Sequence, residues 1–192
     1  MRKPDRRTRK TRARIHEAFF ALMREKAYEK IRVAEIAEQA DISRATFYLH
    51  YETKDDLLTT EVDRIITSYF DAISDPDGTS PEAPIHILFS LWQENLANIR
   101  LIIDAGSEHL IYQRFRRINQ ARTWNSGEEF ALLNTYVGTM LDGACFALLV
   151  RWTKDNAVIP IDQLTTLFSE LRVETLFERL QDKLPNFGKI GG

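Results

Sequence analysis

The sequence has a single cysteine, Cys145, among its 192 residues. One thiol cannot close an intrachain disulfide or supply a multi-cysteine metal cluster, and such sparse cysteine usage is typical of a reducing compartment. No uncharged apolar run approaches the ~20 residues that span a bilayer, and no apolar segment follows the charged N-terminus as it does in a secretory signal. We therefore expect a cytoplasmic protein without a membrane partner.

Sequence motifs of catalysis are equally scarce. The chain has no Gly-rich phosphate loop, no nucleophile elbow and no paired-histidine zinc motif. His86, Glu108 and His109 are conceivable metal ligands, but adjacent residues of a helix point in different directions, so we expect no metal and no cofactor. Cys145 lies in an apolar stretch and is expected to be buried rather than reactive. These absences predict a protein that is not an enzyme.

Signals for β-strands are missing as well. Neither a sustained apolar/polar alternation nor an Asn-Gly or Asp-Gly hairpin between β-branched runs occurs. Apolar residues recur at helical spacing instead, which predicts an all-α fold of about nine helices. The predicted helices cover about residues 8–26, 33–39 and 44–50, a fourth that ends near 73, and then about 84–98, 99–105, 107–122, 128–154 and 161–183. The fourth begins at a capping box of Thr53 and Asp56. A proline-containing stretch from Ser74 to Pro84 is the clearest linker, and we divide the chain into residues 1–54 and 55–192.

The charge is unevenly distributed, although the net charge is only −2. Residues 1–54 contain 14 Lys and Arg against 8 Asp and Glu, whereas the remainder contains 12 against 20. The first 14 residues alone carry eight basic side chains and one acidic one. A basic head on an acidic body favours contact of the head with a polyanion, with a solvated basic tail as the alternative.

Two short helices joined by a tight turn, at residues 33–39 and 44–50, have the spacing of a helix-turn-helix. Asp41 tolerates the left-handed backbone that the turn requires, and the hydroxyl of Ser43 is expected to cap the second helix. Phe47 is expected to hold this helix inward. The side chains left to reach a DNA groove are then Arg44, Ala45, Thr46, Tyr48, Leu49 and His50.

At these residues the sequence resembles the DNA-binding head of the TetR/AcrR family of bacterial transcriptional regulators. The resemblance covers residues 11–58 and is carried by Ile42-Ser43-Arg44-Ala45-Thr46-Phe47-Tyr48, His50-Tyr51, Lys54 and Leu57-Leu58. It implies a sequence-specific regulator, most often a repressor, that binds a palindromic operator as a homodimer and responds to a small molecule. Its motifs cover about a quarter of the chain, and the remainder agrees with the family in length and helical order.

This chain departs from the family pattern at several positions. Ala27 and Asp41 stand where the family usually has glycine, and Ala45 where it often has one. Arg32 replaces the Ser or Thr that caps the second helix; we expect the lost cap to cost about 1 kcal/mol and the arginine to add a phosphate contact. The resemblance and the geometry together predict the DNA-binding residues Arg32, Val33, Arg44, Ala45, Thr46, Tyr48, Leu49, His50 and Lys54.

These residues are expected to differ in what they contact. Arg44 is the candidate reader of a guanine, with a phosphate contact as the equal alternative, and the methyl group of Ala45 suits a thymine methyl. Tyr48 and His50 are expected to reach backbone oxygens, and Lys54 a phosphate at a helix N-terminus. The alternatives are a core position for Tyr48, a surface position without a role for His50, and a helical interaction protein that has lost DNA binding.

The rest of the chain is expected to dimerise and to bind an effector. Apolar stripes on the last two long helices predict an interface of Phe130, Leu133, Val137, Leu141, Leu164, Leu167, Phe168 and Leu171. The resemblance implies a pocket, whose candidates are Phe70, Phe89, Trp92, Tyr112, Phe115, Tyr136, Met140 and Phe146, with ordinary core packing as the alternative for each. These side chains suit an apolar or aromatic effector.

Overall fold

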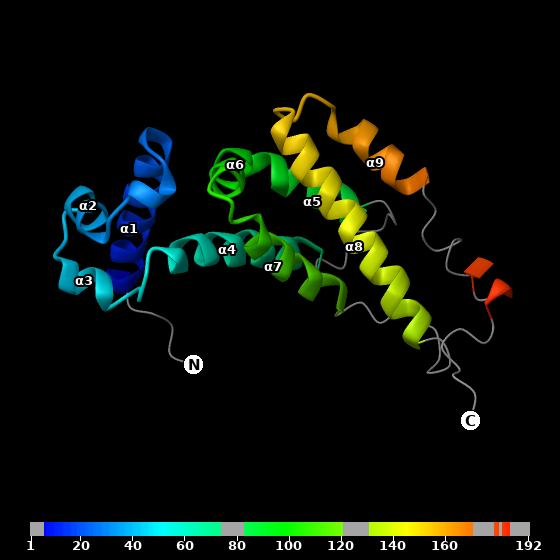
Figure 1. Cartoon of the computed structure of the whole chain (residues 1–192), viewed down its shortest axis with the longest axis horizontal. Coiled ribbons are helices and arrows are strands. Elements are labelled where there is room, and N and C mark those ends of the chain that lie inside the picture. Colours follow the sequence, from blue (N-terminus) through cyan, green and yellow to red (C-terminus); the bar gives the residue numbers. More distant parts are fainter. Residues whose placement is uncertain (1–5, 74–82, 121–130, 171–178, 181, 185–192) are drawn as a thin grey trace. The chain divides into compact units, whose positions relative to one another are not determined.

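The computed structural model describes residues 6–73, 83–120, 131–170, 179–180 and 182–184, and every regular element in these ranges is a helix (Figure 1). The elements are α1 (Arg6–Glu25), the 3-10 turn η1 (Tyr28–Lys30), α2 (Val33–Gln39), α3 (Arg44–Tyr48), α4 (Asp55–Ile73), α5 (Ala83–Glu94), α6 (Leu96–Asp104), α7 (Glu108–Gln120), α8 (Ala131–Lys154) and α9 (Ile161–Glu170). The all-α prediction is confirmed. Residues 74–82 of the predicted linker, and residues 171–178 of the predicted last helix, lie outside the described residues; Ala83 and Pro84, predicted as linker, belong to α5.

The chain divides into two compact units. Unit 1 contains the described residues up to Arg64 together with Ala97–Leu110, and unit 2 contains Ile65–Leu96 and the described residues from Ile111 onward. Most of α6 therefore packs with the N-terminal helices, although it follows them in sequence by more than thirty residues. The predicted division at residues 54 and 55 stays a prediction, because compactness does not test where a domain folds independently.

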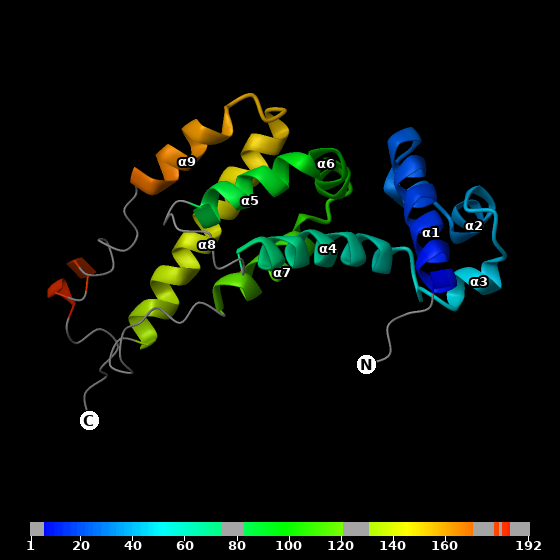
Figure 2. The ribbon, with the colours of Figure 1, turned by 180° about the vertical axis from the view of Figure 1, so that it is seen from behind.

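Unit 1 has an apolar core around the face of α1 that the sequence predicts. Ile15, Phe19 and Leu22 are buried there, and the rings of Phe19 and Phe20 meet edge to face with centroids 5.2 Å apart. Seen from behind in Figure 2, α2 lies against α1 and α3 against α2. Aromatic and branched side chains at this density are the main source of stability in a small helical unit.

The turn between α2 and α3 has the predicted residue in the left-handed conformation, and a side chain of α1 stabilises it, which the sequence did not reveal. Asp41 has φ of 50°, and the Arg14 guanidinium of α1 donates hydrogen bonds to its carbonyl (3.0 Å) and its carboxylate (2.8 Å). Ser43 Oγ accepts the backbone N–H of Thr46 at 3.0 Å, so the predicted cap is confirmed. The start of α3 is thereby fixed to α1.

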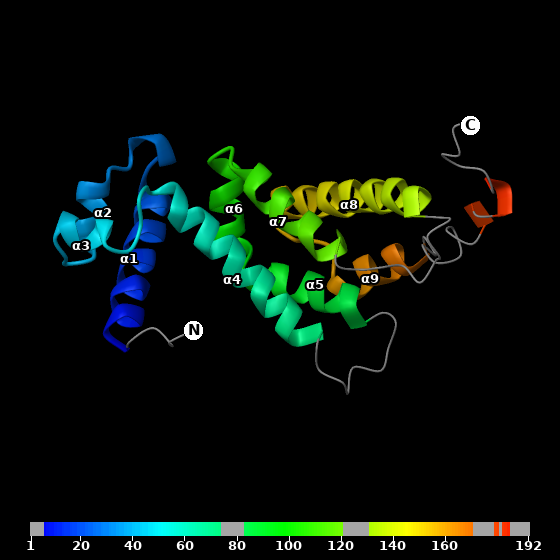
Figure 3. The same cartoon turned by 90° about the horizontal axis from the view of Figure 1, so that it is seen from below.

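Unit 2 contains two aromatic clusters. In the first, Phe89 of α5 meets Trp152 of α8 edge to face at 5.8 Å, and the indole N–H of Trp92 donates to the buried hydroxyl of Thr153 at 2.8 Å. In the second, Phe146 of α8 lies near the rings of Tyr112 (5.1 Å) and Phe115 (6.5 Å) of α7. Figure 3 shows α9 beside α5, on which it packs.

Cys145 is buried in α8, as predicted. Among the helices of the described ranges, none combines the length and the apolarity that crossing a membrane would take.

Candidate DNA-binding site

One face of α3 and the residue after it is exposed as the sequence predicts. Arg44, Ala45, Tyr48 and Leu49 lie one helical turn apart in pairs, so they share a face. Tyr48 is 57% exposed and Leu49 is 82% exposed, whereas Phe47 on the opposite side is fully buried. The alternative of a core position for Tyr48 is wrong. An exposed face on a helix with a buried anchor can enter a groove without losing its own packing.

Thr46 and His50 flank this face and are half-buried. The hydroxyl of Thr46 lies 2.9 Å from that of Ser43, and the backbone N–H of His50 donates to the carbonyl of Phe47 at 2.9 Å. Both residues are therefore fixed by local hydrogen bonds at the two ends of α3. Their DNA contacts remain predictions.

The start of α2 has no side-chain hydrogen bond from Arg32 as a cap, as expected, but Glu35 replaces part of what is lost. Arg32 is exposed, and its backbone N–H donates to Glu35 Oε2 at 2.9 Å, which is the reciprocal half of a capping box. Lys26 Nζ binds the other carboxylate oxygen at 2.6 Å, and this bond, followed by the one from Arg32, lowers the pKa of Glu35 to about 2. Glu35 thus compensates in part for the missing Ser or Thr, and the guanidinium of Arg32 is left at the surface beside the half-buried Val33.

Lys54 makes contacts within the head that the sequence did not predict. Its ammonium group donates to the carbonyl oxygens of Tyr28 (2.7 Å) and Ile31 (3.0 Å) and lies 4.1 Å from the Tyr28 ring centroid. Burial lowers the pKa of Lys54, against a smaller opposing effect of Glu29. Two of its three donors bind the segment between α1 and α2, so Lys54 has a structural role, and its phosphate contact stays a prediction.

Lys54→Met should therefore destabilise the head by about 1–3 kcal/mol, because two carbonyl groups lose a charged donor. The slope of operator affinity against salt concentration should stay as it is in the parent protein. Thermal unfolding and binding titrations at several salt concentrations measure the two effects. Lys30→Met, at an exposed position of η1, is the matched control. If Lys54→Met instead reduced the slope of log affinity against log salt concentration by about one and left the stability unchanged, Lys54 would be a phosphate contact.

Basic side chains of α1 lie near the end of α3. The guanidinium carbon of Arg12 is 5.2 Å from the ring centroid of Tyr51, three residues beyond α3, and Arg14 reaches the turn before it. Arg6, Arg7, Arg9 and Lys10, in the first turns of α1, are exposed. The positive charge of Arg12 and Arg14 thus lies close to both ends of α3.

Of the residues predicted for the dimer interface, some are buried within the chain and others are exposed. Leu133, Val137 and Leu164 are buried within the chain, and Leu180 and the half-buried Leu141 pack against the first two. These residues are core, which corrects their assignment to an interface surface. Leu167 is exposed and Phe168 half-buried, so they remain available, whereas Phe130 and Leu171 lie outside the described side chains.

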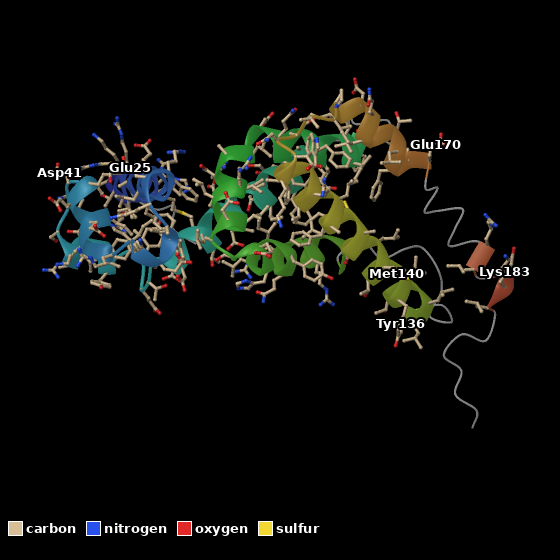
Figure 4. The ribbon with its side chains drawn as sticks, turned by 45° about the horizontal axis from the view of Figure 1, so that its top comes forward. Glu25, Asp41, Tyr136, Met140, Glu170 and Lys183 are labelled. Atoms are coloured by element: carbon tan, nitrogen blue, oxygen red, sulfur yellow. The ribbon has the colours of Figure 1, made fainter. Side chains whose placement is uncertain are left out.

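Two of the predicted pocket residues are in a different environment from the rest. Phe89, Trp92 and Phe115 are buried, and the half-buried members are Phe70, Tyr112 and Phe146. Tyr136 is 58% exposed and Met140 is 71% exposed on α8 (Figure 4). Together with exposed Leu132 they form an apolar stripe one residue out of phase with the buried Leu133 and Val137, about 100° around the helix. Their assignment to a pocket is corrected, because they line the outside of the unit.

The fold and this site define the class of the protein: it is all-helical, and its N-terminal unit contains a helix-turn-helix. Residues 15–59 match the family model described as "Bacterial regulatory proteins, tetR family". The N-terminal segment is thus similar to the DNA-binding part of the TetR family, and the resemblance inferred from the sequence is confirmed for these residues. The family consists of regulators and not of enzymes, in agreement with the prediction.

Known proteins that the chain resembles include one curated sequence relative and several solved structures. An uncharacterized HTH-type transcriptional regulator, YxbF from Bacillus subtilis (strain 168), is 37% identical over 71 residues, which are 36% of this chain and only 19% of that protein. Lin0861 from Listeria innocua superposes with a TM-score of 0.69 at 21% identity, over 90% of this chain and 94% of that one. A TetR transcriptional regulator from Streptococcus agalactiae gives 0.61 at 21%, over 87% and 96%. Because these superpositions cover about nine-tenths of the chain, the similarity of fold includes the helices that follow the helix-turn-helix.

The conceivable metal ligands do not form a site. Across the part of the chain that the structure describes, no three His, Cys, Asp or Glu side chains are placed to hold a metal ion together. His86 instead lies 3.4 Å from the carboxylate of Asp162, an exposed contact between α5 and α9.

Proposed function

We propose that this protein is a cytoplasmic, ligand-responsive transcriptional repressor that binds a palindromic operator as a homodimer. The observation that carries the proposal is the exposed face of Arg44, Ala45, Tyr48 and Leu49, fixed from behind by Phe47 and at its start by the Ser43 cap. A helix that binds in a DNA groove must keep its conformation when its exposed face is buried there. The residues that fix this helix do so without the side chains of the exposed face, which are therefore free to contact DNA.

The face combines groups that read bases with groups that hold the backbone. Arg44 can donate two parallel hydrogen bonds to a guanine, and the methyl group of Ala45 can meet that of a thymine. The Tyr48 hydroxyl and His50 suit phosphate oxygens, which set the register of the head without reading sequence. The exposed arginines of α1 add sequence-independent attraction to the duplex.

A single head reads few base pairs, so specific binding calls for two copies with half-sites about one helical turn apart. The apolar stripe of Leu132, Tyr136 and Met140 on α8 suits the second copy, because large apolar side chains in a continuous exposed row favour burial. Leu167 of α9 adds a further exposed apolar side chain within the same unit.

The aromatic clusters of unit 2 support an apolar or aromatic effector. Phe146 and Tyr112 are only half-buried although their rings are in contact, so part of their surface is left for another group to cover. An effector that binds one arrangement of the body better than another shifts the population of dimers that fit the operator. Repression would follow from occupation of a promoter.

Selection of duplexes from random or genomic DNA by the purified protein tests this function. We expect a two-fold symmetric motif among the selected sequences. Arg44→Ala should relax the preference at one position of each half-site by about 1–3 kcal/mol, if it reads a base. Tyr48→Phe should weaken all duplexes alike. Uniform weakening by Arg44→Ala would assign it to phosphate, and a protein that selects no duplex over competitor would refute the proposed function.

A further inference from the structure

Unit 1 contains a buried carboxylate that the DNA-binding face does not use. Glu61 of α4 has no exposed surface, although it stands among the apolar residues Leu57, Leu58, Val62 and Ile65, which are also buried. A buried carboxylate is stable only where charged or polar donors surround it. The donors around Glu61 come from three helices that are distant in sequence.

The carboxylate receives four hydrogen bonds. Arg64, one turn further along α4, donates two of them, from Nε at 2.8 Å and from Nη2 at 2.9 Å. His16 Nε2 of α1 lies 3.0 Å from Oε2, and Asn98 Nδ2 of α6 donates to Oε1 at 2.8 Å. The pair with Arg64 is bidentate and already neutralises the charge. His16 and Asn98 therefore add connection between helices rather than charge balance.

Asn98 has a second partner on α1. Its carbonyl oxygen Oδ1 accepts a hydrogen bond from Arg24 Nη2 at 3.3 Å. An amide side chain has one donor end and one acceptor end, and only this orientation matches a carboxylate on one side and a guanidinium on the other. Asn98 thus bridges α4 and α1, and it is carried by a helix 37 residues further along the chain than Glu61.

We propose that Asn98 is a positioning residue for DNA binding, through which α6 holds α1 and the start of α4 in the arrangement that fits the operator. The Asn98–Glu61–His16 connection, with Arg24 and Arg64 at its edges, is called the α6 latch here. The inference rests on the proposed DNA-binding function and adds that the head is incomplete without α6.

The test compares full-length Asn98→Ala, Asn98→Asp, Glu61→Gln and the double variant Glu61→Gln/Asn98→Asp with the parent protein. Operator affinity on the selected duplex and hydrogen exchange of the α1 amides are the two readouts. Asp104→Asn is the matched control, because Asp104 is an exposed residue of the same helix whose partner is Arg100 of α6. Thermal unfolding of each variant verifies that it is folded.

We expect Asn98→Ala to lower operator affinity on the order of tenfold and to speed exchange in α1, since hydrogen bonds to charged groups are lost. Asn98→Asp should lower it by about a hundredfold, because a second carboxylate then faces Glu61. The double variant should recover about tenfold of that loss, since the amide and the carboxylate have exchanged places and the relocated carboxylate can pair with Arg24.

Each outcome decides the proposal. Normal affinity and normal α1 exchange in both Asn98 variants would overturn it, and so would a double variant whose loss of affinity equals the sum of the losses in Glu61→Gln and Asn98→Asp. If the single variants unfold, recovery in the double variant still supports the latch and its absence overturns it. If the parent protein selects no duplex, the proposed function fails, while faster α1 exchange in Asn98→Ala but not in Asp104→Asn still supports the connection.

Discussion

Replacement of Met140 by glutamate should turn the protein into a monomer and lower its operator affinity by on the order of a hundredfold. Met140 is 71% exposed in the single chain and lies within the apolar stripe with Leu132 and Tyr136. If this stripe packs against a second copy, two-fold symmetry brings two new carboxylates into one interface. Their burial without partners is strongly unfavourable, so the dimer should dissociate.

Sedimentation or light scattering over a range of concentrations measures the oligomeric state, and a titration on the operator measures affinity. Val158→Glu is a matched control, because Val158 is 72% exposed and apolar but lies in the turn before α9. The control should stay dimeric and bind normally. A Met140→Glu protein that remains dimeric would show that the stripe on α8 is not the interface.

The helical fold was predictable from sequence, because apolar periodicity and capping residues act locally. The limits of α2 match the prediction, and Ser43 caps α3 as expected. η1 was missed, since a three-residue turn leaves no periodic signal. The exposed face of α3 was predictable for the same reason: Phe47 fixes which side is buried, and the other side chains follow from the geometry of the helix.

The predictions on α8 were wrong where two adjacent stripes are both apolar. Leu133 and Val137 were assigned to the interface and Tyr136 and Met140 to the pocket, but the first pair is buried and the second exposed. Sequence periodicity shows that the helix is apolar over a wide arc, and it cannot tell which part of that arc the chain covers itself. Only the packing of neighbours such as Leu180 decides this.

For the charged residues Lys54 and Glu61, too, the sequence does not show which groups the side chains contact. The position of Lys54 at a helix N-terminus favoured a phosphate, yet two backbone carbonyls of the preceding turn take its donors. Glu61 interrupts the apolar face of α4, which indicates a buried partner. The partners His16 and Asn98 lie 45 and 37 residues away, at distances over which no local pattern carries information.

Acid should destabilise unit 1, and Glu61→Gln should remove much of that sensitivity. Burial raises the pKa of Glu61, but the hydrogen bonds from Arg64, His16 and Asn98 outweigh it and hold the pKa well below its usual range. A carboxyl with a depressed pKa in the folded state stabilises the fold above the pKa of the unfolded chain, near 4.5. That stabilisation is lost as the pH falls from the pKa of the unfolded chain through the lower pKa of the folded protein.

Glutamine resembles the protonated carboxyl in shape and charge, so Glu61→Gln at neutral pH should lack the stabilisation that the parent loses in acid through Glu61. We expect a loss of about 3 kcal/mol at pH 7, since a buried ion pair is broken while Arg64, which is half exposed, regains water. Chemical unfolding of both proteins between pH 3 and 7, within roughly the range where a glutamate titrates, measures the difference. The parent curve should fall and the Glu61→Gln curve should be flatter.

Glu17→Gln serves as the control, because Glu17 is an exposed carboxylate on α1 next to His16. It should leave both the stability and its dependence on pH as they are in the parent protein. Glu35, whose pKa is lowered to about 2, adds an acid sensitivity of the same sign, so some slope should persist in Glu61→Gln. Parallel curves for the parent and Glu61→Gln would mean that Glu61 is not ionised in the folded protein, and the charged centre of the α6 latch would then be wrong.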